Sequence, residues 1–177
     1  MYLHYVNKCI IFLACMTLLA CTEISYKEPQ PKRIKSLESV PEKLHGSYLW
    51  DGDTVIFFDK GFRVKDKKED VLYLSDSIVL KKYKNHYFVN YREGFEWRLR
   101  ILKPLKNGDL MFLEMENVPE DEAERKIFIE KLSAVTPVIE TSIDSSKHYI
   151  IDPSAKKLYA LISKGFFKER KPLEKIK

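Results

Sequence analysis

The stretch from Leu44 to Met115 constrains the fold most, because short runs rich in Val, Ile, Tyr, Phe and Trp alternate there with turn signals. Asp51-Gly52 and Asn107-Gly108 are typical of β-turns, in which glycine readily takes a positive φ. We expect about eight strands, over Gly46–Trp50, Thr54–Phe58, Phe62–Lys65, Val71–Leu74, Ile78–Tyr83, His86–Arg92, Phe95–Leu105 and Leu110–Glu116. Short connections predict an antiparallel meander, and so many twisted strands favour a curled sheet or a barrel-like closure.

One of these runs alternates more cleanly than the others. Trp97, Leu99 and Ile101 fall on one side of the strand, and charged residues occupy the positions between them. Successive side chains of a strand point to opposite faces, so the pattern predicts one buried face and one wet face. We therefore expect Trp97 to lie in the interior and Arg98 and Arg100 to face water.

After Asn117 the hydrophobic period becomes helical. Proline and acids at 119–122 precede apolar residues at helical spacing up to Leu132, which indicates a helix that ends before Thr136-Pro137. A short hairpin is expected over Val138–Ile143 and His148–Ile151. A second helix should follow, capped by Asp152 and ended by Gly165, and the last ten residues should be frayed. The predicted class is α+β: a meander, then helix, hairpin and helix.

The N-terminus has the layout of a signal peptide. Lys8 precedes an apolar run from Cys9 to Ala20, which is shorter than the ~20 residues of a membrane-spanning helix, so we expect residues 1–20 to be removed. The sequence LLAC at 18–21 resembles the lipobox of bacterial lipoproteins. An ordinary secretory signal with a coincidental cysteine is the alternative.

The resemblance implies a cut between Ala20 and Cys21 and a lipid anchor on the Cys21 thiol, with palmitate or similar chains holding the protein on an envelope membrane. Thr22 stands where an aspartate would retain such a protein at the inner membrane of enteric bacteria. The outer membrane, facing the periplasm, is therefore the favoured location. The membrane, reached through Cys21, is the first expected partner.

The remainder divides into two parts on composition. Prolines and charges over 22–43 indicate a flexible tether behind the lipidated Cys21, and 44–177 is expected to form a single globular domain. All three cysteines lie at or before the proposed cut, so the mature chain has no disulfide. The precursor carries a net charge of +5, but its lysines alternate with acids and no basic aromatic face emerges. We expect no nucleic-acid partner.

Residues that could carry chemistry are dispersed. His45, His86 and His148 are far apart and lack the spacing of metal ligands, so neither a metal nor a cofactor is predicted. Asp51-Gly52-Asp53 lacks the later ligands of a calcium loop and is interpreted as a turn. Glu93 and Glu96 beside Trp97 resemble a glycosidase pair only in composition, and a hairpin turn is the stronger interpretation.

These observations favour a non-catalytic role. With no GxSxG motif and no catalytic residue assigned, the expected function is a membrane-anchored binding or assembly module that is not an enzyme. A lipocalin-like carrier of a small apolar ligand is the alternative, although Gly46-Ser47-Tyr48 has tyrosine where lipocalins have GxW. An envelope hydrolase is the third hypothesis. Further partners would be an envelope protein, a cell-wall polymer or a small apolar ligand, and its binding residues are unassigned.

Overall fold

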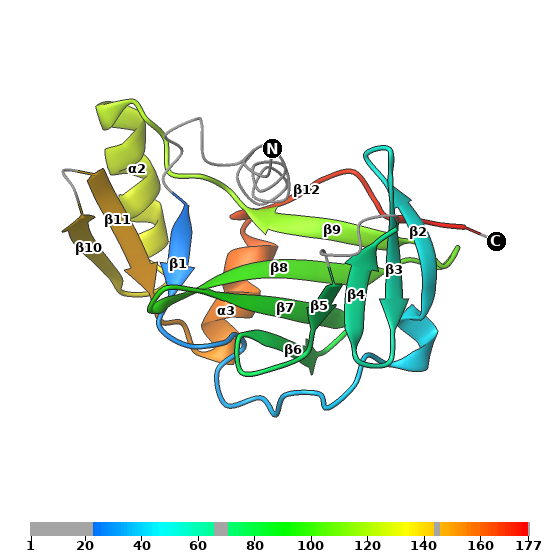
Figure 1. Ribbon diagram of the computed structural model, residues 1–177. Helices are drawn as coiled ribbons and strands as arrows, with labels where there is room; N and C mark the ends of the chain where they lie inside the picture. Colours follow the sequence, from blue (N-terminus) through cyan, green and yellow to red (C-terminus); the bar gives the residue numbers. More distant parts are fainter. Residues whose placement is uncertain (1–22, 66–70, 144–145, 177) are drawn as a thin grey trace, which may run out of the picture.

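The computed structural model describes residues 23–65, 71–143 and 146–176, which form two β-sheets and two α-helices (Figure 1). In chain order the elements are β1 (Ile24–Tyr26), the 3₁₀ helix η1 (Glu42–Leu44), β2 (Gly46–Trp50), β3 (Asp53–Phe58), β4 (Gly61–Val64), β5 (Val71–Tyr73), β6 (Ile78–Tyr83), β7 (His86–Glu93), β8 (Glu96–Pro104), β9 (Leu110–Met115), α2 (Glu122–Ser133), β10 (Val138–Ile143), β11 (Ser146–Ile151), α3 (Ala155–Ser163), β12 (Phe167–Glu169) and β13 (Glu174–Lys175).

The larger sheet has the order β10-β11-β1-β8-β7-β6 and is extended by β9 and β12. Strands β6 to β9 pair antiparallel with their chain neighbours, whereas β1 lies parallel to β11. One edge of β8 is shared by two strands: β1 pairs with it at Trp97, and β9 pairs with it from Arg100 to Pro104. A fork therefore forms where β1 and β9 diverge.

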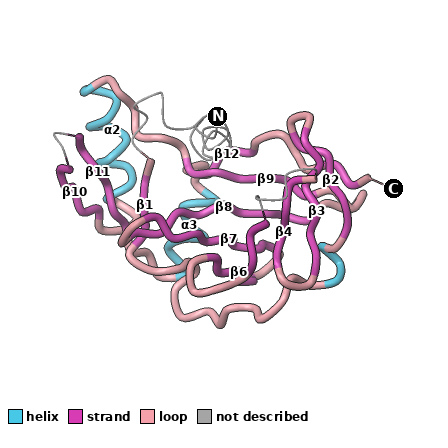
Figure 2. Tube along the Cα trace, in the orientation of Figure 1, coloured by secondary structure: helices cyan, strands magenta, loops and turns pink. Residues whose placement is uncertain are grey.

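The smaller sheet has the order β13-β2-β3-β4-β5 and is antiparallel throughout. Its strands run roughly across those of the larger sheet in Figure 1, at the end of the molecule opposite α2 and β1. The tube in Figure 2 shows the same arrangement, with helix confined mainly to one end and one side of the larger sheet.

Two hydrophobic cores lie on the two faces of the larger sheet. The first packs this sheet against α2 and α3 and includes Phe88, Trp97, Leu99, Ile101 and Leu132. The second lies between the two sheets and consists of Val40, Leu44, Tyr48, Val55, Phe57, Leu80, Tyr87, Val89, Leu102, Leu110 and Leu173. Both faces of β7 are thus buried, because Phe88 belongs to the first core and Tyr87 and Val89 belong to the second.

The eight strands predicted between Leu44 and Met115 are present, each within one residue of its expected ends. They do not form one curled meander, however. β5 and β6 are not paired, so the chain divides into β2–β5 and β6–β9, and the antiparallel sheets are not closed into a barrel. Crossing one sheet over the other buries an apolar face of each without closure, because the rings of Tyr48 and Phe57 fill the space between them.

The predicted helix, hairpin and helix follow in that order. α2 begins at the N-cap Asp121, whose side chain accepts a hydrogen bond from Glu124 N at 2.9 Å. α3 is capped by Ser154, and the expected cap Asp152 instead accepts a bond from Lys32 Nζ at 2.5 Å. The C-terminal residues are also not frayed where they form β12 and β13, which pair with β9 and β2.

The predicted tether is wrong for residues 23–43, which pack on the domain. Ile24 and Tyr26 are each 1% exposed in the first core. Further along, Gln30 is fully buried, and its backbone groups are paired with Asn90. The Gln30 N–H donates to Asn90 Oδ1 at 2.6 Å, and the Gln30 carbonyl accepts from Asn90 Nδ2 at 2.8 Å. The Asn90 side chain thereby supplies hydrogen-bond partners for backbone groups of this polar, proline-rich segment, which has no regular secondary structure there to pair them.

Lys81 holds the same segment from β6. Its ammonium donates to the carbonyls of Pro29 at 2.7 Å and Pro31 at 3.1 Å. Burial lowers the pKa of Lys81, and the nearby Glu28 offsets part of that effect. The domain therefore begins about twenty residues earlier than the composition indicates.

Candidate functional site

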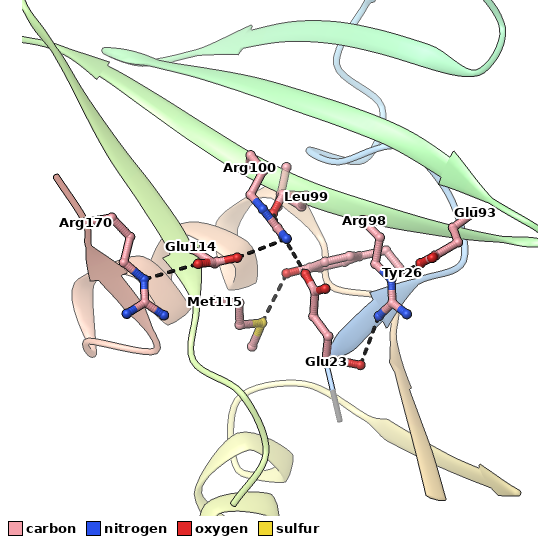
Figure 3. Close-up of polar contacts among 9 residues, drawn as sticks. All are labelled: Glu23, Tyr26, Glu93, Arg98, Leu99, Arg100, Glu114, Met115 and Arg170. Atoms are coloured by element: carbon pink, nitrogen blue, oxygen red, sulfur yellow. Dashed lines mark hydrogen bonds and ion pairs between the residues drawn. The ribbon is translucent and has the colours of Figure 1, made fainter. Parts of the chain in front are cut away.

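The main polar feature of the interior is a charged cluster at the fork between β1 and β9, formed by Glu23, Arg98, Arg100, Glu114 and Arg170 (Figure 3). The alternation of β8 places both of its arginines on the face opposite Trp97. Glu114 lies directly across from Arg100 in β9. The cluster thus occupies the part of this sheet face that the smaller sheet does not cover.

Arg100 joins the two strands of the fork. One of its terminal nitrogens pairs with Glu23, and the other lies 2.9 Å from Glu114 Oε1. The side chains of Arg100 and Glu114 are only 10% and 7% exposed, so this ion pair is largely shielded from water. Arg170 Nε contacts the other Glu114 oxygen at 3.1 Å. Glu114 therefore bridges two guanidinium groups.

Arg98 completes the attachment of the chain at Glu23. Its Nη1 donates to the Glu23 backbone carbonyl at 3.0 Å, and its Nε lies 2.7 Å from Glu93 Oε2. Beside it, the Tyr26 hydroxyl donates to Met115 Sδ at 3.1 Å across the fork. Glu23 is thus fixed by both its side chain and its backbone.

The surroundings of the cluster raise the pKa values of Arg100 and of two neighbouring tyrosines. Burial alone lowers the pKa of Arg100, but Tyr91 and the carboxylates of Glu23 and Glu114 more than offset this, and the net pKa is raised. Burial raises the pKa of Tyr26 and of Tyr91, so both phenols remain neutral. The ion pairs of the cluster can therefore hold distant chain segments together.

The structure does not bring the three histidines together. His45 Nε2 lies 2.8 Å from the Val40 carbonyl, His86 packs against Phe88 and Tyr159, and His148 lies on β11. Among the described residues no group of three or more His, Cys, Asp or Glu side chains could hold a metal ion.

The acids considered for catalysis face each other at the tip of the β7–β8 hairpin. Glu93 and Glu96 are a cross-strand pair around Gly94, whose φ of 59° fits the tight turn. Glu93 is held by Arg98, and Phe95 beside them is 94% exposed. Asp51 and Gly52 likewise have positive φ between β2 and β3, and Asp51 pairs with Lys171 at 2.9 Å. The turn interpretation of both segments agrees with this geometry.

A groove of about 700 Å³ lies between α2 and the turn from α3 to β12. Its floor includes Phe128 and Phe166, whose ring centroids lie 5.7 Å apart, and lysines 131, 164 and 168 stand around it. A smaller hollow of about 270 Å³ lies on the other side of α2. We call the first hollow the α2 groove.

The sequence indicated part of this arrangement. It placed Trp97 correctly in the interior, at 9% exposure, but the prediction that Arg100 faces water is wrong, because Glu23 and Glu114 cover it. Two arginines inside a strand, with an acid inside the apolar run of the neighbouring strand, were the available signal. No pattern in the sequence indicated that Glu23 would join this cluster. Cys21 and Ala20 lie outside the described residues.

Comparison with known protein families, characterised sequences and solved structures finds no match to this chain. No helix within the described ranges is long and apolar enough to cross a membrane.

Proposed function

We propose that the protein is an envelope lipoprotein, anchored through lipid on Cys21 after cleavage behind Ala20, whose domain serves as a non-catalytic binding or assembly module. The outer membrane is the favoured location because Thr22 follows the lipid-bearing cysteine. The lipid alone would hold the protein on the membrane, because two or three acyl chains bury enough methylenes for stable attachment to a bilayer.

The observation that carries the proposal is the junction between LLAC and the folded domain. Glu23, two residues after Cys21, is already fixed by Arg98 and Arg100. The two cores of the described residues extend from Ile24 to Leu173, so a chain cut in front of Cys21 retains all of them. Cleavage at the proposed processing site would therefore leave every described residue of both cores in the mature chain.

The packing of the interior supports a binding module rather than a carrier with a ligand cavity between its sheets. A carrier for an apolar molecule needs an open space between its sheets. Here Tyr48, Tyr87 and Leu110, each 1% exposed or less, occupy that space, and both hollows described above lie on the surface beside α2. The most buried charged groups are also engaged in ion pairs or in bonds to carbonyls, which favours a structural role for them.

The test is metabolic labelling with radioactive palmitate and detergent partitioning in a bacterial host. The wild-type chain should incorporate label and enter the detergent phase, and Cys21→Ser should do neither. Cys15→Ser removes a thiol from the signal segment and should behave as wild type. Labelling of Cys21→Ser equal to wild type would rule out lipidation at this residue.

A further inference from the structure

The chain between the proposed lipid-bearing residue and the folded domain is very short. Only Thr22 separates Cys21 from Glu23, and a fully extended chain covers about 3.5 Å per position, so over two positions the lipid-bearing residue stays within about 7 Å of Glu23. Glu23 cannot swing away, because Arg100 and Arg98 hold its side chain and its carbonyl. If Cys21 is lipidated, the bilayer must begin beside the fork of β1 and β9.

The α2 groove adjoins this point. Tyr26 of β1 contacts Met115, the last residue of β9, at 3.1 Å, and the next residue, Glu116, lines the groove. The Glu116 N–H donates to the Phe166 carbonyl at 2.8 Å, so the floor of the groove is tied to the same end of β9. In Figure 1 α2 and β1 lie toward one end of the molecule, opposite the smaller sheet, and β9 runs from the smaller sheet in their direction.

The groove has the chemistry of a surface that meets phospholipid headgroups. Lys131 and Lys164 are exposed on its rim, and Lys168 lies 3.4 Å from Glu116. Ile127, at 51% exposure, and the floor rings supply apolar surface between these cations. Lysines on an apolar surface attract anionic headgroups while their alkyl stems rest at the interface.

The distribution of acids limits which part of this end faces the bilayer. Glu120, Asp121 and Glu122 gather at the start of α2, where an anionic surface would repel them. The C-terminal half of α2 instead carries Lys131, and Lys164 follows α3. The lining of the groove has three lysines, Lys131, Lys164 and Lys168, and two acids, Glu116 and Glu124. Because Lys168 pairs with Glu116, the groove keeps a small positive excess.

We propose that the domain sits directly on the bilayer, with the α2 groove against anionic phospholipid headgroups and the smaller sheet directed away from the membrane. The inference rests on the proposed lipidation of Cys21 and adds an orientation to it. A partner in the envelope would then meet the smaller sheet and not α2.

The experiment uses the lipidated protein in phosphatidylcholine vesicles with about 30% phosphatidylglycerol. After processing, the chain has no thiol besides Cys21, so a single introduced cysteine can carry a fluorophore. Lys164→Cys places it on the groove and Lys60→Cys places it on the β3–β4 turn of the smaller sheet, as the matched control. A nitroxide on the lipid headgroup quenches fluorophores that lie at the membrane surface.

Quenching should be several-fold stronger at position 164 than at position 60. Inserting about twenty Gly and Ser residues between Thr22 and Glu23 should lower quenching at 164 to the level at 60, because a few screened lysines do not hold the domain down once the connection is long. Equal quenching at both positions in the original protein would overturn the orientation. Strong quenching at 164 that the insertion leaves unchanged would support the groove contact but overturn the short connection as its cause. Palmitate incorporation, measured on the same samples, separates these outcomes from a failure of lipidation itself.

Discussion

Arg100 of β8 forms an ion pair with Glu23, a residue 77 positions earlier in the chain. The pair fixes the first described residue of the domain to the middle of the larger sheet. Because Arg100 also contacts Glu114 at 2.9 Å, one guanidinium connects β1, β8 and β9 at the point where the sheet forks. This connection holds the residue before β1 against β8 and β9.

Arg100→Ala should lower the free energy of unfolding by about 3 kcal/mol or more, because it leaves the carboxylate of Glu114 buried beside fewer cations. Urea denaturation followed by circular dichroism would measure the change. Lys103→Ala is the matched control in the same strand: its pair with Glu169 spans 3.5 Å, the lysine is 40% exposed, and its loss should cost below about 1 kcal/mol. Equal effects of the two substitutions would contradict a special role for Arg100.

A mature chain that begins at Pro41 should be strongly destabilised relative to one that begins at Thr22. The shorter chain lacks Ile24 and Tyr26, and burial of each such side chain is worth ~1.5–3 kcal/mol, against ~5–15 kcal/mol for a whole domain. Thermal unfolding of the two forms would test this. A melting temperature within a few degrees of the longer form would show that residues 22–40 act as a disposable tether after all.

The sequence predicted the local elements well for a physical reason. Alternation with a period of two and turn residues such as Asn107-Gly108 act within a few positions, so the ends of the strands between Leu44 and Met115 follow from nearby residues alone. The same holds for α2, whose acids and proline mark its start.

The errors concern contacts between distant segments. β1 is only three residues long and has no period to detect, and its burial depends on β8 and β11. Gln30 looks like a linker residue because its partner, Asn90, lies 60 positions away. Whether a meander closes into a barrel or divides into two crossed sheets likewise depends on which strands pair, and local patterns do not specify the gap between β5 and β6.

Trp97→Ala should lower the free energy of unfolding by ~3–5 kcal/mol or prevent soluble expression, because the indole fills the first core beside Leu99. Phe95→Ala is a close control. Its ring stands two positions earlier in the chain and is 94% exposed, so its truncation should change stability by less than ~0.5 kcal/mol. Chemical denaturation of both variants gives the comparison. If Trp97→Ala is as stable as the wild type, the indole does not contribute to the packing of the core.

His86 should make the stability of the domain depend on pH in the mildly acidic range. Its ring is 7% exposed against Phe88 and Tyr159, and burial, followed by the positive charges of Lys103 and Lys84, lowers its pKa below the ordinary value of about 6.5. The folded state therefore binds this proton less readily than the unfolded state. The contribution of neutral His86 is complete above the unfolded pKa and is lost as the pH falls from there toward the folded pKa.

The measurement compares unfolding free energies of wild type and His86→Gln from about pH 7 to pH 5, since glutamine does not titrate. The wild type should lose more stability than the variant over this interval, whatever the absolute cost of the substitution. Added salt should reduce the difference only partly, because it screens Lys84 and Lys103 but does not relieve the burial that is the first cause of the shift. Parallel curves for the two proteins would show that His86 gains its proton as easily in the folded domain as in the unfolded chain.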